Sequence, residues 1–84
     1  MPYRYSAGTA TTTNAAAALT DFGTLDYVHL VNAGANAAEF RLDGGDWATL
    51  PAGNGFELRV QSVATVEVRS KVADLPTDIL YYLD

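Results

Sequence analysis

Apolar and polar residues alternate along most of the chain after residue 26. The alternation is clearest at residues 38–42, 56–60 and 65–70, where every second side chain is apolar except for Ser70 at the end of the last run. A period of two is typical of strands that bury one face, so each run predicts a β-strand. The pattern assigns to the buried side Ala38, Phe40, Leu42, Phe56, Leu58, Val60, Val66 and Val68.

Apolar runs at residues 27–31 and 79–83 predict further strands. Turn residues separate the runs: DGGDW at 43–47 is a hairpin signal, PAGNG at 51–55 is a second turn, and residues 72–78 form a loop that contains Pro76. Six or seven short strands joined by such turns predict an all-β fold, a small antiparallel β-sandwich of the jelly-roll-like kind.

The first 20 residues differ from the rest, since they are mostly Ala, Thr, Gly and Ser. Residues 14–23 fit either a short helix, with Asn14 as its N-cap and Gly23 after its end, or an extended segment. Residues 1–10 have little to bury, yet they contain Tyr3, Arg4 and Tyr5. They predict an extended N-terminal arm that contacts a partner, followed by a single domain at residues 11–84.

The composition narrows the classes of partner. The 84 residues include ten acidic and five basic side chains, with net charge -5 and no cysteine. A domain this short buries only about 60% of its unfolded surface and has no disulfide to support it, so we expect a homo-oligomer, a trimer. The acidic balance argues against nucleic acid and anionic membranes as partners. With no apolar leader and no membrane-span-length run, synthesis in a cytoplasm is expected.

Catalytic chemistry has little support in these residues. His29 is the single imidazole, and it lies within a predicted strand with no nucleophile nearby in sequence. Asp43 and Asp46 flank two glycines; they fit a turn, with a Ca²⁺ site as the alternative. We therefore predict that the protein is not an enzyme and uses no cofactor or metal.

Three copies of the pattern Glu-apolar-Arg occur, each inside a predicted strand. The two charged residues of each copy share the face opposite the apolar one, so neighbouring strands can join them in ion pairs. The pattern fits a solvated sheet face or a charged subunit interface. The residues are Glu39, Arg41, Glu57, Arg59, Glu67 and Arg69.

Aromatic residues indicate a second surface. Tyr27, His29 and Val31 share the strand face opposite Val28 and Leu30, and an outer face with these side chains suggests an oligomer or partner contact. Tyr81 and Tyr82 must point to opposite sides of their strand, and we assign Tyr82 to the same contact face. Trp47 is predicted to anchor the core, with an exposed sugar-binding platform as the alternative.

Several segments together resemble the small β-sandwich accessory proteins in the virions of tailed bacteriophages. They are TTTNAAAALT, YVHLVNAGANAAEFRLDGG, TLPAGNGFELRV, ATVEVRS and ILYYL, which cover roughly residues 10–83. The resemblance implies that the small-residue segment near the N-terminus is extended rather than helical. It also implies a capsid decoration (cement) protein on the virion surface, bound to the major capsid protein. The alternative is a carbohydrate- or receptor-binding module of a tail fibre, which would use Trp47 and a tyrosine.

Overall fold

The computed structural model describes residues 5–19 and 24–84 and contains eight strands in this part of the chain. Each predicted alternating run is a strand, and the turns lie where the glycines and Pro51 predicted them. The strands are β1 (Ser6–Thr11), β2 (Ala17–Ala18), β3 (Leu25–Asn32), β4 (Ala38–Leu42), β5 (Ala48–Leu50), β6 (Gly55–Val63), β7 (Val66–Ser70) and β8 (Asp78–Leu83).

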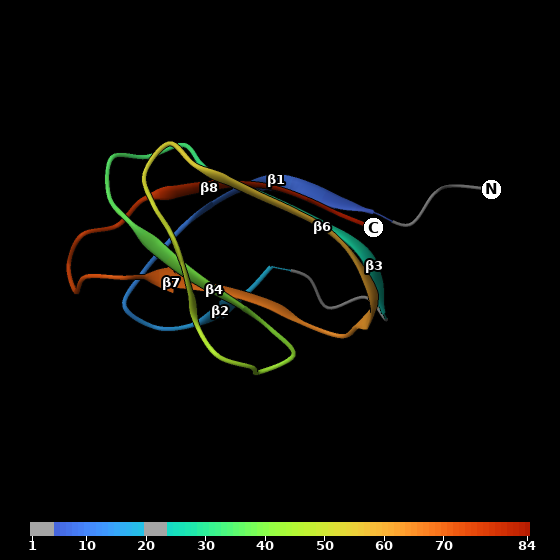
Figure 1. Ribbon diagram of the computed structural model, residues 1–84. Helices are drawn as coiled ribbons and strands as arrows, with labels where there is room; N and C mark the ends of the chain where they lie inside the picture. The colour runs from blue at the N-terminus through green and yellow to red at the C-terminus, as the bar shows by residue number, and fades with distance from the viewer. Residues whose placement is uncertain (1–4, 20–23) are drawn as a thin grey trace.

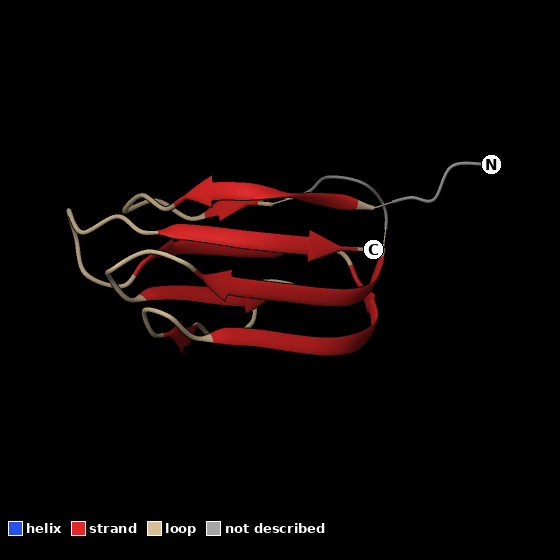
Figure 2. Cartoon of the chain, turned by 90° about the horizontal axis from the view of Figure 1, so that it is seen from above, coloured by secondary structure: helices blue, strands red, loops and turns tan. Residues whose placement is uncertain are grey.

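Two four-stranded antiparallel sheets pack face to face (Figures 1 and 2). Their strand orders are β1-β8-β3-β6 and β2-β7-β4-β5. The first strand therefore pairs with the last, the second with the seventh, the third with the sixth and the fourth with the fifth. This nested pairing is that of one long hairpin, with its tip at residues 43–47, rolled into two layers. The fold is a jelly roll, as predicted.

The core lies between the sheets. Of the side chains that the alternation placed inside, Ala38, Phe40, Val66 and Val68 belong to it, and Leu42, Phe56 and Val60 are partly buried against it. The hydrophobic core cluster contains Leu25, Val28, Leu30, Ala38, Phe40, Leu50, Val63, Val66, Val68, Ile79 and Leu83. The rings of Phe40 and Phe56 meet across the sheets at 4.5 Å between centroids.

Leu58 differs from its prediction. It lies directly opposite Val28 and so faces inward, yet it is 44% exposed. Strand β6 is at the edge of its sheet, and β5, the edge strand of the other sheet, has only three residues. The second layer therefore ends before it covers Leu58.

The N-terminal segment is extended rather than helical over the described residues 5–19. Here the structure differs from the predicted arm. Residues 6–10 pair with β8 along strand β1, from Ser6 opposite Leu83 to Thr11 opposite Asp78. The sandwich thus begins before residue 11. The small side chains of β1 bury little, but an edge strand can be held by its main-chain pairing with β8. Tyr3 and Arg4 lie outside the described residues.

A buried polar network closes one end of the sandwich. The Asn32 side chain is fully buried; its Nδ2 donates to the carbonyls of Asn36 (2.8 Å) and Leu50 (2.9 Å). Its Oδ1 accepts from the Gly34 amide (3.1 Å) and the Thr77 hydroxyl (2.7 Å). A Cβ on Gly34 would lie 2.0 Å from the Thr77 Oγ1, so only glycine fits there. Asn32 therefore fixes three loops relative to β3.

The DGGD segment is a turn, as the first of its two interpretations predicted. Asp43 and Gly44 both have positive φ (51° and 68°), and the Asp43 carboxylate accepts from the amides of Ala64 (2.7 Å) and Thr65 (2.9 Å). Asp43 thereby joins the β4–β5 turn to the β6–β7 turn.

Candidate partner-binding face

The outer surface of the β1-β8-β3-β6 sheet collects aromatic and aliphatic side chains. The register places Tyr82 opposite His29 and Leu80 opposite Val31. Because directly opposed residues share a face, four residues predicted for a partner face do lie on one side of the sheet. We call this surface the aromatic face; it consists of Tyr5, Tyr27, His29, Val31, Leu80 and Tyr82.

The rings of the aromatic face contact one another. Tyr5 stacks on Tyr82 with 5.8 Å between ring centroids and 16° between planes. Tyr27 meets Tyr82 edge to face at 6.0 Å, and His29 meets Tyr27 at 6.4 Å. These contacts join rings from β3, from β8 and from Tyr5, which directly precedes β1. Tyr5 nevertheless remains 55% exposed, Leu80 45% and Tyr82 38%. A rigid and exposed aromatic surface is suited to contact with another molecule.

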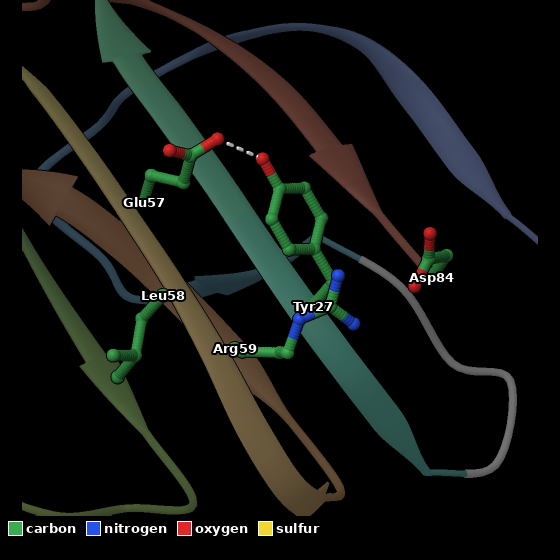
Figure 3. A pocket seen from close by; sticks show the side chains of 5 residues that line it. All are labelled: Tyr27, Glu57, Leu58, Arg59 and Asp84. Atoms are coloured by element: carbon green, nitrogen blue, oxygen red, sulfur yellow. Dashed lines mark hydrogen bonds between the residues drawn. The ribbon is translucent and has the colours of Figure 1, made fainter.

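An open depression of about 560 Å³ borders the aromatic face (Figure 3). Tyr27, Glu57, Leu58, Arg59 and Asp84 line it. The Tyr27 hydroxyl donates a hydrogen bond to the Glu57 carboxylate, and the Arg59 guanidinium lies 6.0 Å from the centre of the Tyr27 ring. The depression thus combines an aromatic ring with carboxylate and guanidinium groups, which can hydrogen-bond polar ligands.

Two phenols of this face have altered acidity. The hydrogen bond to Glu57, followed by burial and the charge of the same carboxylate, raises the pKa of Tyr27. Burial, followed by the charge of Asp84 and a hydrogen bond to it, raises the pKa of Tyr82. Both phenols are held neutral, as donors, at any physiological pH.

The outer surface of the other sheet carries charged residues. Glu39 lies opposite Arg69 and Arg41 opposite Glu67, and each pair forms an ion pair, at 3.0 Å and 2.9 Å. Two of the three Glu-apolar-Arg copies are therefore joined across β4 and β7. The third copy lies in the first sheet, on β6, where Glu57 and Arg59 flank Tyr27.

The prediction that Trp47 anchors the core is wrong. Trp47 is only half-buried, and its ring lies against the guanidinium groups of Arg69, at 3.9 Å from the ring centre, and Arg41, at 4.5 Å. The chain turns at Gly44 and Gly45 and brings the indole over the charged pairs instead of between the sheets. The Trp47 ring thus makes cation–π contacts with two arginines of the charged surface instead of contacts in the core.

Sequence reasoning missed two members of the aromatic face. Leu80 follows the same alternation as Tyr82, so the pattern of the last strand contained this signal. Tyr5 had been assigned to an arm, and only the pairing of β1 with β8 places it beside Tyr82.

Among residues 5–19 and 24–84 there is no group of three or more His, Asp or Glu side chains that could hold a metal ion. The same residues include no helix with the length and apolarity needed to cross a membrane.

The fold and this face define the class of protein: a small jelly-roll sandwich with one aromatic and one charged outer surface. No family model, curated protein or solved structure matches the chain.

Proposed function

We propose that the protein is a structural, non-enzymatic component of a bacteriophage virion, a decoration protein that binds the major capsid protein at the capsid surface. The aromatic face carries the proposal, because it groups exposed Tyr5, Leu80 and Tyr82 on one face of a sheet, with Tyr5 stacked on Tyr82. Aromatic side chains held in place supply much contact area at low cost in conformational entropy.

The resemblance of the segments and the jelly-roll fold both support this function. The fold alone does not separate it from the alternative, because jelly rolls occur in viral capsid domains and in lectins. The alternative, a carbohydrate-binding module of a tail fibre, draws on the depression beside Tyr27. Its ring, with Glu57, Arg59 and Asp84 around it, offers stacking and hydrogen bonds of the kind sugars use.

The test is co-sedimentation with purified phage shells that lack the protein. Leu80→Ser removes an exposed apolar side chain from the aromatic face, and Leu75→Ser removes one of nearly the same exposure, 44% against 45%, from a loop. We expect Leu80→Ser to weaken retention on shells by about tenfold, as loss of an interface contact of roughly 1.4 kcal/mol would.

Leu75→Ser should be retained like the unmodified protein. Equal retention of both variants would exclude the aromatic face as the contact. Binding to immobilised glycans together with no binding to shells would support the tail-fibre alternative.

A further inference from the structure

Strand edges are where sheets recruit further strands, and this sandwich has four of them: β1, β6, β2 and β5. Three are short or interrupted. β2 has two residues, and β5 has three and is followed directly by Pro51. These lengths leave little backbone for an added strand to pair with.

The β6 edge is long but interrupted. Its register with β3 shifts between the pairs Leu25–Val63 and Tyr27–Arg59, so β6 carries extra residues there, and Ser62 has a positive φ of 55°. Glu57 and Arg59 add charges to the same strand. A bulge and charged side chains are the usual protection of an edge strand.

The β1 edge has none of these protections. It runs for six residues, SAGTAT, with no charged residue and no proline, and among the described residues it pairs only with β8. Figure 2 shows this strand, the first after the N-terminus, at the outer border of its sheet. A regular, uncharged edge of this length, about 20 Å, is a template for another strand.

We propose that β1 pairs antiparallel with β1 of a second copy, forming a two-fold dimer with a continuous eight-stranded sheet, in place of the trimer expected from the sequence. The side chains on both faces of β1 are small, so two copies can approach without steric conflict. The register with β8 shows that Ala7, Thr9 and Thr11 point to the outer face, since they lie opposite Tyr82, Leu80 and Asp78.

The symmetry fixes which residues meet. The two-fold axis is perpendicular to the sheet. If it passes at Thr9, Thr9 lies opposite Thr9 of the second copy. If it passes one residue along the strand, Ala7 lies opposite Thr9 of the second copy. Both arrangements bring uncharged outer side chains together despite the net charge of -5. The same axis turns the two aromatic faces to one side of the dimer. A second copy therefore fits this edge and also doubles the surface proposed to bind the capsid.

The test uses two double variants that place either two positive or two negative charges at the exposed positions 7 and 9. Ala7→Lys with Thr9→Lys places like charges opposite each other in both arrangements, and Ala7→Glu with Thr9→Glu does the same. We expect the unmodified protein to sediment as a dimer at concentrations on the order of 100 µM, since the buried interface is small. Each double variant should self-associate about tenfold more weakly or worse.

An equimolar mixture of the Lys and Glu variants should restore the dimer, because unlike charges then face each other. The control, Ala35→Lys with Ala52→Lys, adds the same charge to exposed loops and should leave the dimer intact. Far-ultraviolet circular dichroism checks that every variant is folded. A monomer or trimer of the unmodified protein, unchanged association of the double variants, or no recovery in the mixture would each overturn the proposal. The assay contains no capsid, so it is independent of the proposed decoration function.

Discussion

At the scale of single residues, two polar side chains hold the loops and turns of the sandwich in place, and the alternating pattern does not reveal either of them. Asn32 satisfies four partners from a fully buried position, and Asp43 joins two turns. On the surface, the hydrogen bond from Tyr27 to Glu57 and the stacking of Tyr5 on Tyr82 fix the aromatic face. Most of these contacts join residues that are distant in sequence; the contacts of Asn32 with Gly34 and Asn36 are local.

Asn32→Ala should destabilise the fold by about 2–4 kcal/mol, because it leaves two carbonyls, an amide and a hydroxyl without their buried partner. Urea unfolding followed by circular dichroism measures the change. Asn54→Ala, at an exposed asparagine in a turn, is the matched control and should stay within about 0.5 kcal/mol. A loss at Asn32 no larger than at Asn54 would mean that water replaces the network without penalty.

The tyrosines predict a dependence of stability on alkaline pH. Folding raises the pKa values of Tyr27 and Tyr82, so the folded state favours their neutral forms. This stabilisation is complete below the unfolded pKa of about 10 and is lost as the pH rises through the folded values. In an ultraviolet titration, Tyr27→Phe and Tyr82→Phe should each remove part of the late-ionising absorbance. The urea-unfolded protein, with all tyrosines ionising together near pH 10, is the reference.

At the scale of elements, strand β1 changes the meaning of the N-terminal segment. Its residues are too small to contribute much to a core, which is why the sequence favoured a separate arm. Main-chain pairing with β8 makes the segment a strand of the sheet. The rest of the arm prediction, contacts of Tyr3 and Arg4 with a capsid, stays a prediction.

Deletion of residues 1–10 should lower the melting temperature by about 10 °C or more, because it removes nearly all of β1 and exposes the edge of β8. Differential scanning calorimetry measures the shift, and the shortened chain should also aggregate more readily through β8. An unchanged melting temperature would instead favour an arm that is independent of the sandwich.

At the scale of the whole molecule, the two sheets have different outer surfaces. One presents the aromatic face, and the other presents the ion pairs Glu39–Arg69 and Arg41–Glu67 with Trp47 over them. Pairing of two copies through β1 would leave the charged surfaces exposed on one side and both aromatic faces on the other. Such a dimer would attach to a repetitive surface at two points.

Two-point attachment predicts that loss of dimerisation weakens binding to shells. The Ala7→Lys, Thr9→Lys protein should be released from shells about 100-fold more readily than the unmodified dimer, because the second contact gains from effective concentration. Dissociation measured on immobilised shells tests this. The equimolar mixture of the Lys and Glu variants, which carries charges at the same two positions but restores the dimer, is the control and should be released slowly. Equal release rates would show that one copy binds alone.

The sequence by itself determined the all-β class, the positions of most strands and the inward side of each. The reason is local: a period of two and the residues of tight turns act within a few positions of the chain. The same local rule placed Tyr27, His29, Val31 and Tyr82 on the outer sides of their strands. The local pattern also predicted that Glu and Arg of the three Glu-apolar-Arg copies could form ion pairs between neighbouring strands. It did not specify which copies would be neighbours.

Tertiary structure alone decided everything that depends on which strands are adjacent. The nested pairing brought Glu39 to Arg69, moved the third charged copy to the other sheet and joined β1 to β8. It left Leu58 uncovered because β5 is short, and Trp47 outside the core because the turn directs it over Arg41 and Arg69. Strand order is set by the collective burial of side chains far apart in sequence, and no local pattern encodes it.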